Sequence, residues 1–311
     1  MAPRTARFQH VVFARRARRA VNFAPGVTQA SAALPLCAPL SADREKAKPR
    51  DDLDAGRLPI SEAAFLDWLF ATAGMDRQCY RVETLRRRLP ACLRRIRAQT
   101  LSEARRKLMQ DPSLIGPALG TITIGVTSFF RDAAVFETLA REVIPSLGRE
   151  NGHPRVWSAG SSSGEELYSV TMLLAEAGLL GRATLLGTDC SAPAIAQARE
   201  GCYEVPALRD VPQGWREKYF VLRHCRWQVC GELRRGAQWR KADLTQIVEP
   251  GLWDLIICRN VAIYFTPAVA ARVYQSLAGA LRPGGVLVVG KAEQPMAATQ
   301  LRPLASCIYR R

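Results

Sequence analysis

The sequence lacks several features that define common classes of protein. It has only three histidines (His10, His153 and His224), which are far apart, and its nine cysteines include no C-x-x-C pair. Because zinc sites use clustered Cys and His ligands, we expect no metal. Scattered cysteines in odd number are typical of free thiols in a reducing compartment, which predicts a cytoplasmic protein. No run approaches about 18 apolar residues, so no transmembrane helix is expected.

Positive charge is in excess, and it is concentrated in two segments. The net charge is +16. Residues 1–50 carry eight Arg and two Lys against two acidic residues, and residues 81–107 carry nine Arg and one Lys against two. The rest of the chain is therefore near neutral. This distribution predicts acidic partners at specific places and disfavours a uniformly cationic surface.

The N-terminal third predicts an extension followed by helices. Residues 1–55 are rich in Ala, Arg and Pro without sustained periodicity, so we expect a disordered basic extension. Residues 56–120 are expected to form a small all-α domain, in which Gly74 ends the first helix and Pro90 disturbs the second. The first apolar stripe at helical spacing consists of Leu66, Leu69, Phe70 and Ala73.

Residues 121–311 predict an α/β domain with a mainly parallel, Rossmann-like sheet, because strands and helices alternate. Its start, 121–126, is β-prone, and a helix over 133–144 is expected with Asp132 as N-cap and Pro145 as its stop. The expected strands are 155–158, 183–187, 255–258 and 285–290, and the expected helices are 164–177, 192–200 and 267–281. A small β insertion is expected at about 205–245, with short strands at 219–222, 226–229 and 238–240.

The first strand-to-helix turn, residues 158–166, reads S-A-G-S-S-S-G-E-E. A glycine-rich turn lets the backbone approach a ligand, and the helix N-terminus adds a positive dipole. The spacing is not G-x-G-x-x-G, and Glu165 and Glu166 would repel a pyrophosphate, which disfavours a dinucleotide. The two glutamates suit a cationic ligand such as S-adenosylmethionine (SAM), although acidic residues also simply favour a helix N-terminus.

Two further strand ends carry polar side chains. The second strand ends in G-T-D at Asp189, where an acidic side chain typically binds ribose hydroxyls. The strand 255–258 leads into Arg259, Asn260 and Tyr264, at the edge where ligands of open α/β sheets bind. Together with the first turn, these positions predict a nucleoside site.

The same segments resemble those of chemotaxis receptor methyltransferases, the CheR family. Residues 258–265, C-R-N-V-A-I-Y-F, resemble its CRN-x-x-IYF, and residues 157–169 resemble its W-S-x-x-C/A-S-T-G-E-E-P-Y-S. Residues 127–132, T-S-F-F-R-D, resemble T-x-F-F-R-D, the family's catalytic stretch. Shorter matches occur at 188–191 and 198–203, and the resemblance covers about residues 60–293.

The resemblance implies a SAM-dependent methyltransferase acting on glutamate carboxylates of chemoreceptors, with no metal. Arg131 and Tyr264 would be catalytic. Glu165 would meet the SAM amino group and Asp189 its ribose, while Asp243 and Leu244 would lie beside the adenine. The remaining expected cofactor residues are Thr127, Arg131, Gly160, Arg259 and Asn260.

The basic segment 81–107 acquires a role from the same resemblance, because the family docks acidic receptor helices on a basic helix at this place. The expected docking residues are Arg86, Arg87, Arg88, Arg94, Arg95 and Arg97. The partner would be the cytoplasmic helices of a chemoreceptor, with membrane proximity only through that receptor. No nucleic acid is expected, and the protein is expected to be a monomer.

Three departures from the family pattern bear on SAM affinity. Gly125 stands where an Asn is usual, Leu167 replaces a Pro, and Lys291 replaces the His of G-H-S-E. Two other functions remain open. The first is a SAM-dependent RNA methyltransferase, which the excess positive charge favours, although the sequence has no N-P-P-Y-type motif. The second is a non-catalytic SAM- or receptor-binding module, which the three departures leave open.

Overall fold

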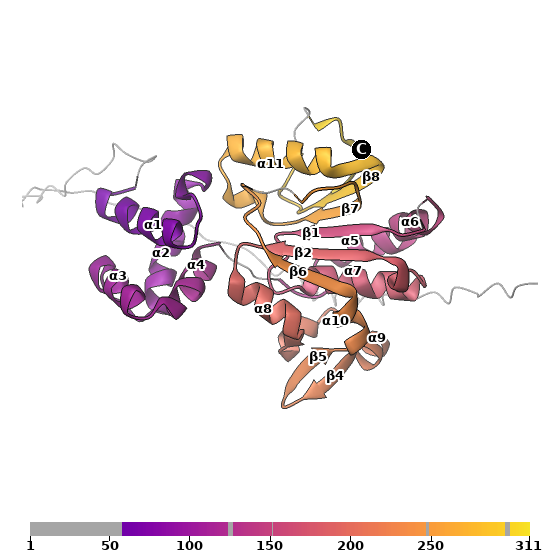
Figure 1. The fold of residues 1–311 in the computed structure, drawn as a ribbon, viewed down its shortest axis with the longest axis horizontal. Helices are drawn as coiled ribbons and strands as arrows, with labels where there is room; N and C mark the ends of the chain where they lie inside the picture. The colour runs from indigo at the N-terminus through magenta and orange to yellow at the C-terminus, as the bar shows by residue number, and fades with distance from the viewer. Residues whose placement is uncertain (1–57, 124–126, 151, 247–248, 296–298) are drawn as a thin grey trace, which may run out of the picture. The chain divides into compact units, whose positions relative to one another are not determined.

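The computed structural model describes residues 58–311, apart from 124–126, 151, 247–248 and 296–298. The predicted basic extension and Gly125 lie outside the described residues. Figure 1 shows a group of helices followed by a twisted sheet with helices on both faces. No helix among the described residues has both the length and the apolar content needed to cross a membrane.

The helical segment comprises α1 (Ile60–Thr72), α2 (Val82–Arg95), α3 (Leu101–Gln110) and α4 (Ile115–Thr123), with 3₁₀ turns η1 (Arg77–Cys79) and η2 (Pro112–Leu114). Leu66, Leu69 and Phe70 are fully buried, and Gly74 has φ +75° just after α1, as predicted. The predicted disturbance at Pro90 is wrong. The helix α2 runs through Pro90, which is exposed, so that water can satisfy the carbonyl it leaves unpaired.

Two predictions at the helix-to-sheet transition are also wrong. Residues 121–123 belong to α4 instead of a strand, because Ala118, Leu119 and Ile122 bury one helical face and packing overrides β propensity. Pro145 does not stop its helix. A π-helical turn, η3 (Leu139–Val143), joins α5 (Ala133–Thr138) to α6 (Ile144–Glu150), and the looser turn accommodates the proline.

The main sheet has the strand order β6-β2-β1-β7-β8-β10-β9. Five neighbouring strands are parallel: β6 (Ala237–Lys241), β2 (Thr184–Asp189), β1 (Arg155–Ala159), β7 (Trp253–Cys258) and β8 (Leu281–Val289). The short β10 (Ile308–Arg310) pairs antiparallel with β8 and with β9 (Arg302–Ala305). The predicted mainly parallel α/β sheet is confirmed. Residues 238–240, expected in the insertion, instead belong to the edge strand of this sheet.

The insertion itself is a three-stranded sheet of order β3-β5-β4. Its strands are β3 (Cys202–Tyr203), β4 (Phe220–Arg223) and β5 (Arg226–Val229), all paired antiparallel. The 3₁₀ turn η5 (Val205–Leu208) and the helices α9 (Gln213–Tyr219) and α10 (Gly231–Gly236) complete the segment.

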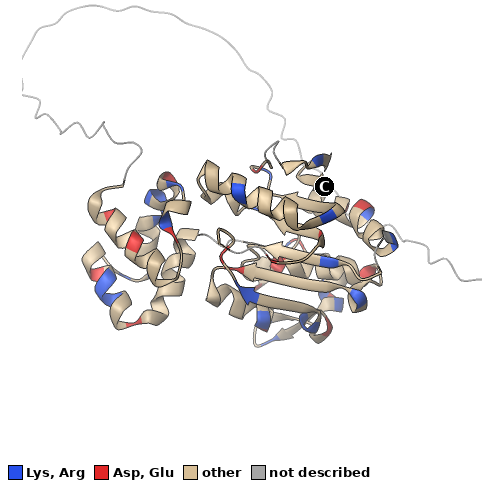
Figure 2. Ribbon diagram, turned by 45° about the horizontal axis from the view of Figure 1, so that its top comes forward, with Lys and Arg blue, Asp and Glu red and all other residues tan. Residues whose placement is uncertain are grey.

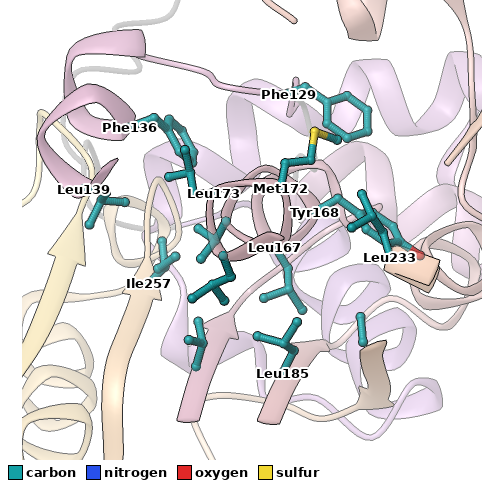
Figure 3. Packing of buried hydrophobic residues seen from close by; sticks show 14 of the residues in the cluster. Phe129, Phe136, Leu139, Leu167, Tyr168, Met172, Leu173, Leu185, Leu233 and Ile257 are labelled. Carbon is teal, nitrogen blue, oxygen red and sulfur yellow. The ribbon is translucent and has the colours of Figure 1, made fainter. Parts of the chain in front are cut away.

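Two apolar clusters cover the two faces of the main sheet, because successive strand residues point to opposite faces. In β7, Leu255 and Ile257 join one cluster, and Ile256 and Cys258 join the other. The first cluster surrounds α7 (Glu165–Glu176), whose residues 165–174 are all buried; Figure 3 shows its Leu167, Met172 and Leu173 among side chains from neighbouring elements. The 3₁₀ turn η4 (Leu180–Arg182) returns the chain to β2.

The second cluster joins α11 (Pro267–Ala280) and the helical segment to the sheet. It includes Leu66 and Phe70 from α1 together with Trp157 from β1 and Val273 from α11. The described residues from 58 onward accordingly belong to one compact unit. A domain boundary near residue 120 stays a prediction.

Candidate functional site

A cavity of about 440 Å³ lies at the carboxyl ends of β1 and β7, the two strands between which the strand order reverses. Ligands of open α/β sheets bind at such a switch point. The cavity has the size of a small-molecule site. It is lined by nine of the ten residues predicted for catalysis or cofactor binding: Thr127, Arg131, Gly160, Asp189, Asp243, Leu244, Arg259, Asn260 and Tyr264.

The turn after β1 is held in shape by the end of β2. The amides of Gly160 and Ser161 both donate to the carbonyl of Thr188 at 2.8 Å. Gly160 has φ +80°, and a Cβ there would lie 2.4 Å from Cγ2 of Val261. Glycine is therefore required at this position by both the backbone conformation and the close approach of the loop after β7.

Asp189 lies beside this turn at the tip of β2, followed by α8 (Ala192–Glu200). Its two carboxylate oxygens accept the amides of Ser162 and Ser191, at 2.9 and 2.8 Å. Burial raises the pKa of Asp189, against the effect of these hydrogen bonds. Each oxygen keeps a further lone pair, so the carboxylate can still accept ligand hydroxyls.

The two glutamates at the start of α7 differ in what they face. Glu165, the predicted partner of the SAM amino group, is buried outside the cavity lining, and its carboxylate accepts the Ser163 hydroxyl at 2.8 and 3.0 Å. Burial raises the pKa of Glu165 to about 7. Glu166 lines the cavity instead, and its Oε1 accepts the Ser158 hydroxyl at 2.9 Å.

Arg259 joins Glu166 to the segment before α5. Its guanidinium is buried, and Nη2 donates to Oδ2 of Asp132 at 2.6 Å while Nη1 lies 3.5 Å from Oε2 of Glu166. Asp132 occupies the N-cap position of α5, as predicted, but makes no capping bond there and has φ +62°. Its carboxylate is directed to Arg259 and Lys291.

The loop after β7 is held by Glu293, which sequence reasoning did not assign to the site. The buried carboxylate accepts the amides of Asn260, Val261, Ile263 and Gly290 at 2.7 to 3.2 Å. Four backbone donors on one carboxylate fix the loop, including Asn260 with its left-handed φ of +60°. The only sequence signal for Glu293 was its place at the end of residues 290–293, G-K-A-E, which stand where the resembled family has G-H-S-E.

Apolar side chains also line the cavity. They are Leu244, Cys190, Val261, Phe265 and Tyr80, and Asp243 lines it as well. The Asp243 carboxylate stabilises its own turn, accepting the amide and the hydroxyl of Thr245 at 2.9 and 2.8 Å. An apolar surface with one acidic side chain at its edge suits a purine base.

Tyr264 stands between the cavity and the helical segment. The amide of Arg81 donates to its carbonyl at 2.9 Å, Nε of Arg81 donates to the carbonyl of Phe265 at 2.8 Å, and the amide of Thr266 donates to the carbonyl of Cys79 at 2.9 Å. Burial raises the pKa of Tyr264, and the positive charges of Arg88, Arg131 and Arg87 oppose that rise. The start of α2 and the Tyr264 loop are therefore tied together.

The six predicted docking arginines separate into groups. Arg95 lines the cavity. Arg88 lies on the same face of α2, is half-buried, and its Nε has no hydrogen-bond partner among the described residues. Arg87 and Arg94 are exposed on the adjacent flank, since residues seven apart share a helix face, whereas Arg86 points to the other side. Arg97 lies beyond the end of α2, which corrects its predicted place on that helix.

Basic residues occur on the helices and the sheet alike, interspersed with acidic ones (Figure 2). On α2, by contrast, the five arginines Arg86, Arg87, Arg88, Arg94 and Arg95 form no ion pair with another residue in the part of the chain that the structure describes. Within that same part, no cluster of His, Cys, Asp or Glu could hold a metal ion.

These features define a class of protein. An α/β sheet carries a glycine turn, an acidic strand tip and a buried glutamate around one cavity at the carboxyl ends of its strands. A family model described as CheR methyltransferase, SAM binding domain, matches residues 125–307. The chain belongs to this family of methyltransferases.

Two relatives place the match along the chain. A chemotaxis protein methyltransferase of Listeria monocytogenes is 34% identical over 223 residues, which cover 71% of this chain and 85% of the relative. Chemotaxis protein methyltransferase 1 of Vibrio cholerae is 30% identical over 233 residues, which cover 72% and 85%. The similarity therefore extends well beyond the motifs into the helical segment.

Proposed function

We propose that the protein transfers the methyl group of SAM to glutamate side-chain carboxylates on the cytoplasmic helices of chemoreceptors. The observation that carries the proposal is one continuous cavity lined by Glu166 and Asp189 at the sheet and by Arg131, Tyr264 and Arg95 on the side of α2. A donor site and a cationic acceptor site thus share one space.

The residues at the sheet end are suited to hold the donor. We assign the ammonium to Glu166 instead of Glu165, because Glu166 lines the cavity. Asp189 would take the ribose, and Leu244 would lie against the base, with Thr127, Gly160 and Asn260 completing the wall. When bound, SAM supplies an electrophilic methyl group on its sulfonium.

The acceptor end requires no general base. An ionised carboxylate is already nucleophilic, and the only cavity-lining thiol, among the described residues, is Cys190, whose pKa is raised by burial. Arg131 would hold the acceptor carboxylate, and the Tyr264 hydroxyl would position it. Placing the two reacting atoms in line and excluding water can contribute about 7–11 kcal/mol.

The flank of α2 is suited to recruit an acidic helix. Arg87 and Arg94 are exposed on the side adjoining the cavity stripe, and Arg88 and Arg95 lead from that flank to Tyr264. Since the start of α2 is hydrogen-bonded to the Tyr264 loop, a helix docked on α2 would lie next to the catalytic residues. Charge complementarity of this kind sets encounter rate and register.

The test uses membranes that carry chemoreceptors from the same organism and tritiated SAM. We expect label on the receptor that alkali releases as methanol, the behaviour of a carboxyl methyl ester. Label that survives alkali would assign a different acceptor atom. Absence of label, with S-adenosylhomocysteine still bound in calorimetry, would overturn the receptor as substrate.

A further inference from the structure

Lys291 belongs to a chain of charges that ends at Glu166 in the cavity. Its Nζ lies 2.6 Å from Oδ1 of Asp132, and Nη2 of Arg259 lies 2.6 Å from Oδ2 of the same carboxylate. Arg259 in turn approaches Glu166. Lys291 itself does not line the cavity and is 69% exposed, so it can act on the cavity only through Asp132.

Asp132 is bound by two cations at once. Burial alone would raise its pKa, but the hydrogen bond from Lys291 and the charges of Arg259, Lys291 and Arg131 outweigh burial and lower the pKa. Asp132 is thus an ionised group at neutral pH whose two oxygens face different partners. The left-handed backbone at Asp132 and the absence of a capping bond leave this carboxylate no local role in the helix.

The single positive charge of Arg259 lies between two carboxylates, those of Asp132 and Glu166. Its side chain is 2% exposed, and its Nε has no hydrogen-bond partner among the described residues. Nη2 lies 2.6 Å from Asp132, whereas Nη1 lies 3.5 Å from Glu166. Burial raises the pKa of Glu166, while Arg259, the Ser158 hydroxyl and Arg131 oppose that rise and the charge of Glu293 adds to it. Glu165 is a further acidic neighbour. Without Lys291, Asp132 would be left with the charges of Arg259 and Arg131, the two arginines that also act on Glu166.

We propose that Lys291 is a positioning residue for the methyl-donor site: by pairing with Asp132, it leaves the Arg259 guanidinium between Asp132 and Glu166, where it can hold the Glu166 carboxylate in place for the donor's ammonium. This inference rests on the assignment of the cavity to SAM in the proposed function. Lysine stays charged across the physiological pH range, so the arrangement does not depend on pH as it would with histidine at this position.

The first experiment measures binding of S-adenosylhomocysteine by calorimetry between pH 5 and 8. Lys291→Ala is expected to weaken binding about two- to fivefold at pH 7, the range for an ion pair with one exposed partner, and to shift the acid-side midpoint of binding to higher pH. Lys291→Arg should behave as the wild type. Lys291→His should resemble the wild type at pH 5.5 and Lys291→Ala at pH 8.

Two controls separate the proposal from a general effect on stability. Lys218→Ala removes another exposed lysine that pairs with a carboxylate, Glu176 at 2.8 Å, far from the cavity, and should leave binding unchanged. In an Asp132→Asn background, Lys291→Ala should have no further effect, because the carboxylate through which it acts is gone.

The proposal is overturned if Lys291→Ala binds like the wild type at every pH, or if its effect is equally large with Asn at position 132. Its failure differs from that of the proposed function. If the wild type does not methylate the receptor but these binding results are obtained, the receptor is not the substrate, and the role of Lys291 in donor binding still stands. A wild type that fails to bind S-adenosylhomocysteine would overturn both.

Discussion

The charged side chains on the two sides of the cavity differ in whether they are paired within the protein. On the sheet side, Asp189, Glu166, Glu293 and Arg259 each have hydrogen bonds or ion pairs inside the protein. On the α2 side, Arg87 and Arg94 are exposed and form no ion pair with any described residue. The first side is preorganised for a small ligand, whereas the second presents charge for a partner from outside.

The difference explains which substitutions should affect which substrate. Breaking an internal network should disturb folding and donor binding, because buried polar groups lose their partners. Changing an exposed arginine should alter only the encounter with an acidic acceptor. Residues between the two sides, above all Arg131, should affect the chemical step.

Arg131→Ala should have the largest effect. It removes the cation expected to orient the acceptor, and methyl transfer should fall at least about 100-fold, whereas affinity for S-adenosylhomocysteine should fall only about fivefold because Arg131 also acts on Asp132 and Glu166. Turnover with labelled SAM and calorimetry on the same preparation measure both. As a control, Arg141→Ala, at an exposed position in η3, should leave turnover unchanged. Unchanged turnover in Arg131→Ala would remove Arg131 from the mechanism.

Glu293→Gln tests the internal network. An amide cannot serve four backbone donors as a carboxylate does, so the free energy of unfolding should fall by about 2–3 kcal/mol and donor affinity should fall with it. Denaturant unfolding and calorimetry check both quantities. Glu249→Gln, which affects a buried carboxylate paired with Arg240 outside the cavity, should cost stability without loss of donor affinity. Equal donor affinity in both variants would contradict the role of Glu293.

Glu165→Gln tests the cost of a buried carboxylate on the sheet side. The folded-state pKa of Glu165 is about 7, above its unfolded value near 4.5, so the unfolded state releases this proton first. Stability is therefore lost as pH rises from about 4.5 to 7, and the penalty persists above. The amide variant should have a higher melting temperature than the wild type at pH 8 and a similar one at pH 4.5. Exposed Glu137→Gln should show no such pH dependence.

The paired reversal Arg87→Glu and Arg94→Glu tests the α2 side and should have the smallest effect in free energy. Receptor KM should rise about tenfold at low salt, and the difference should shrink as salt screens it. Arg86→Glu, on the side of α2 that faces away from the cavity-lining Arg95, provides the control. Wild-type KM in the paired variant at low salt would show that the receptor docks elsewhere.

Several features were predictable because they follow from local rules. Asp189 and Arg259 were placed by the tendency of ligands to bind at the carboxyl ends of parallel strands. Strand residues such as Leu255 and Ile256 follow from apolar runs. The cavity lining was therefore largely accessible from sequence.

Other features depended on contacts that no local pattern carries. Glu165 and Glu166 are neighbours in sequence but about 100° apart around α7, and spacing does not tell which of them faces the cavity. Glu293 binds amides about thirty residues away, and Lys291 acts through Asp132. Tertiary packing also decided that residues 121–123 extend a helix and that residues 238–240 complete the main sheet.

The central claim is that the donor and the acceptor are recognised by two electrostatically different sides of one cavity. The most direct test is a salt titration of the wild-type protein, measuring receptor KM and the Kd of S-adenosylhomocysteine in the same buffers. The account predicts that receptor KM rises steeply with salt while the Kd stays nearly constant. Two curves that move together, or a receptor KM that ignores salt, would contradict it.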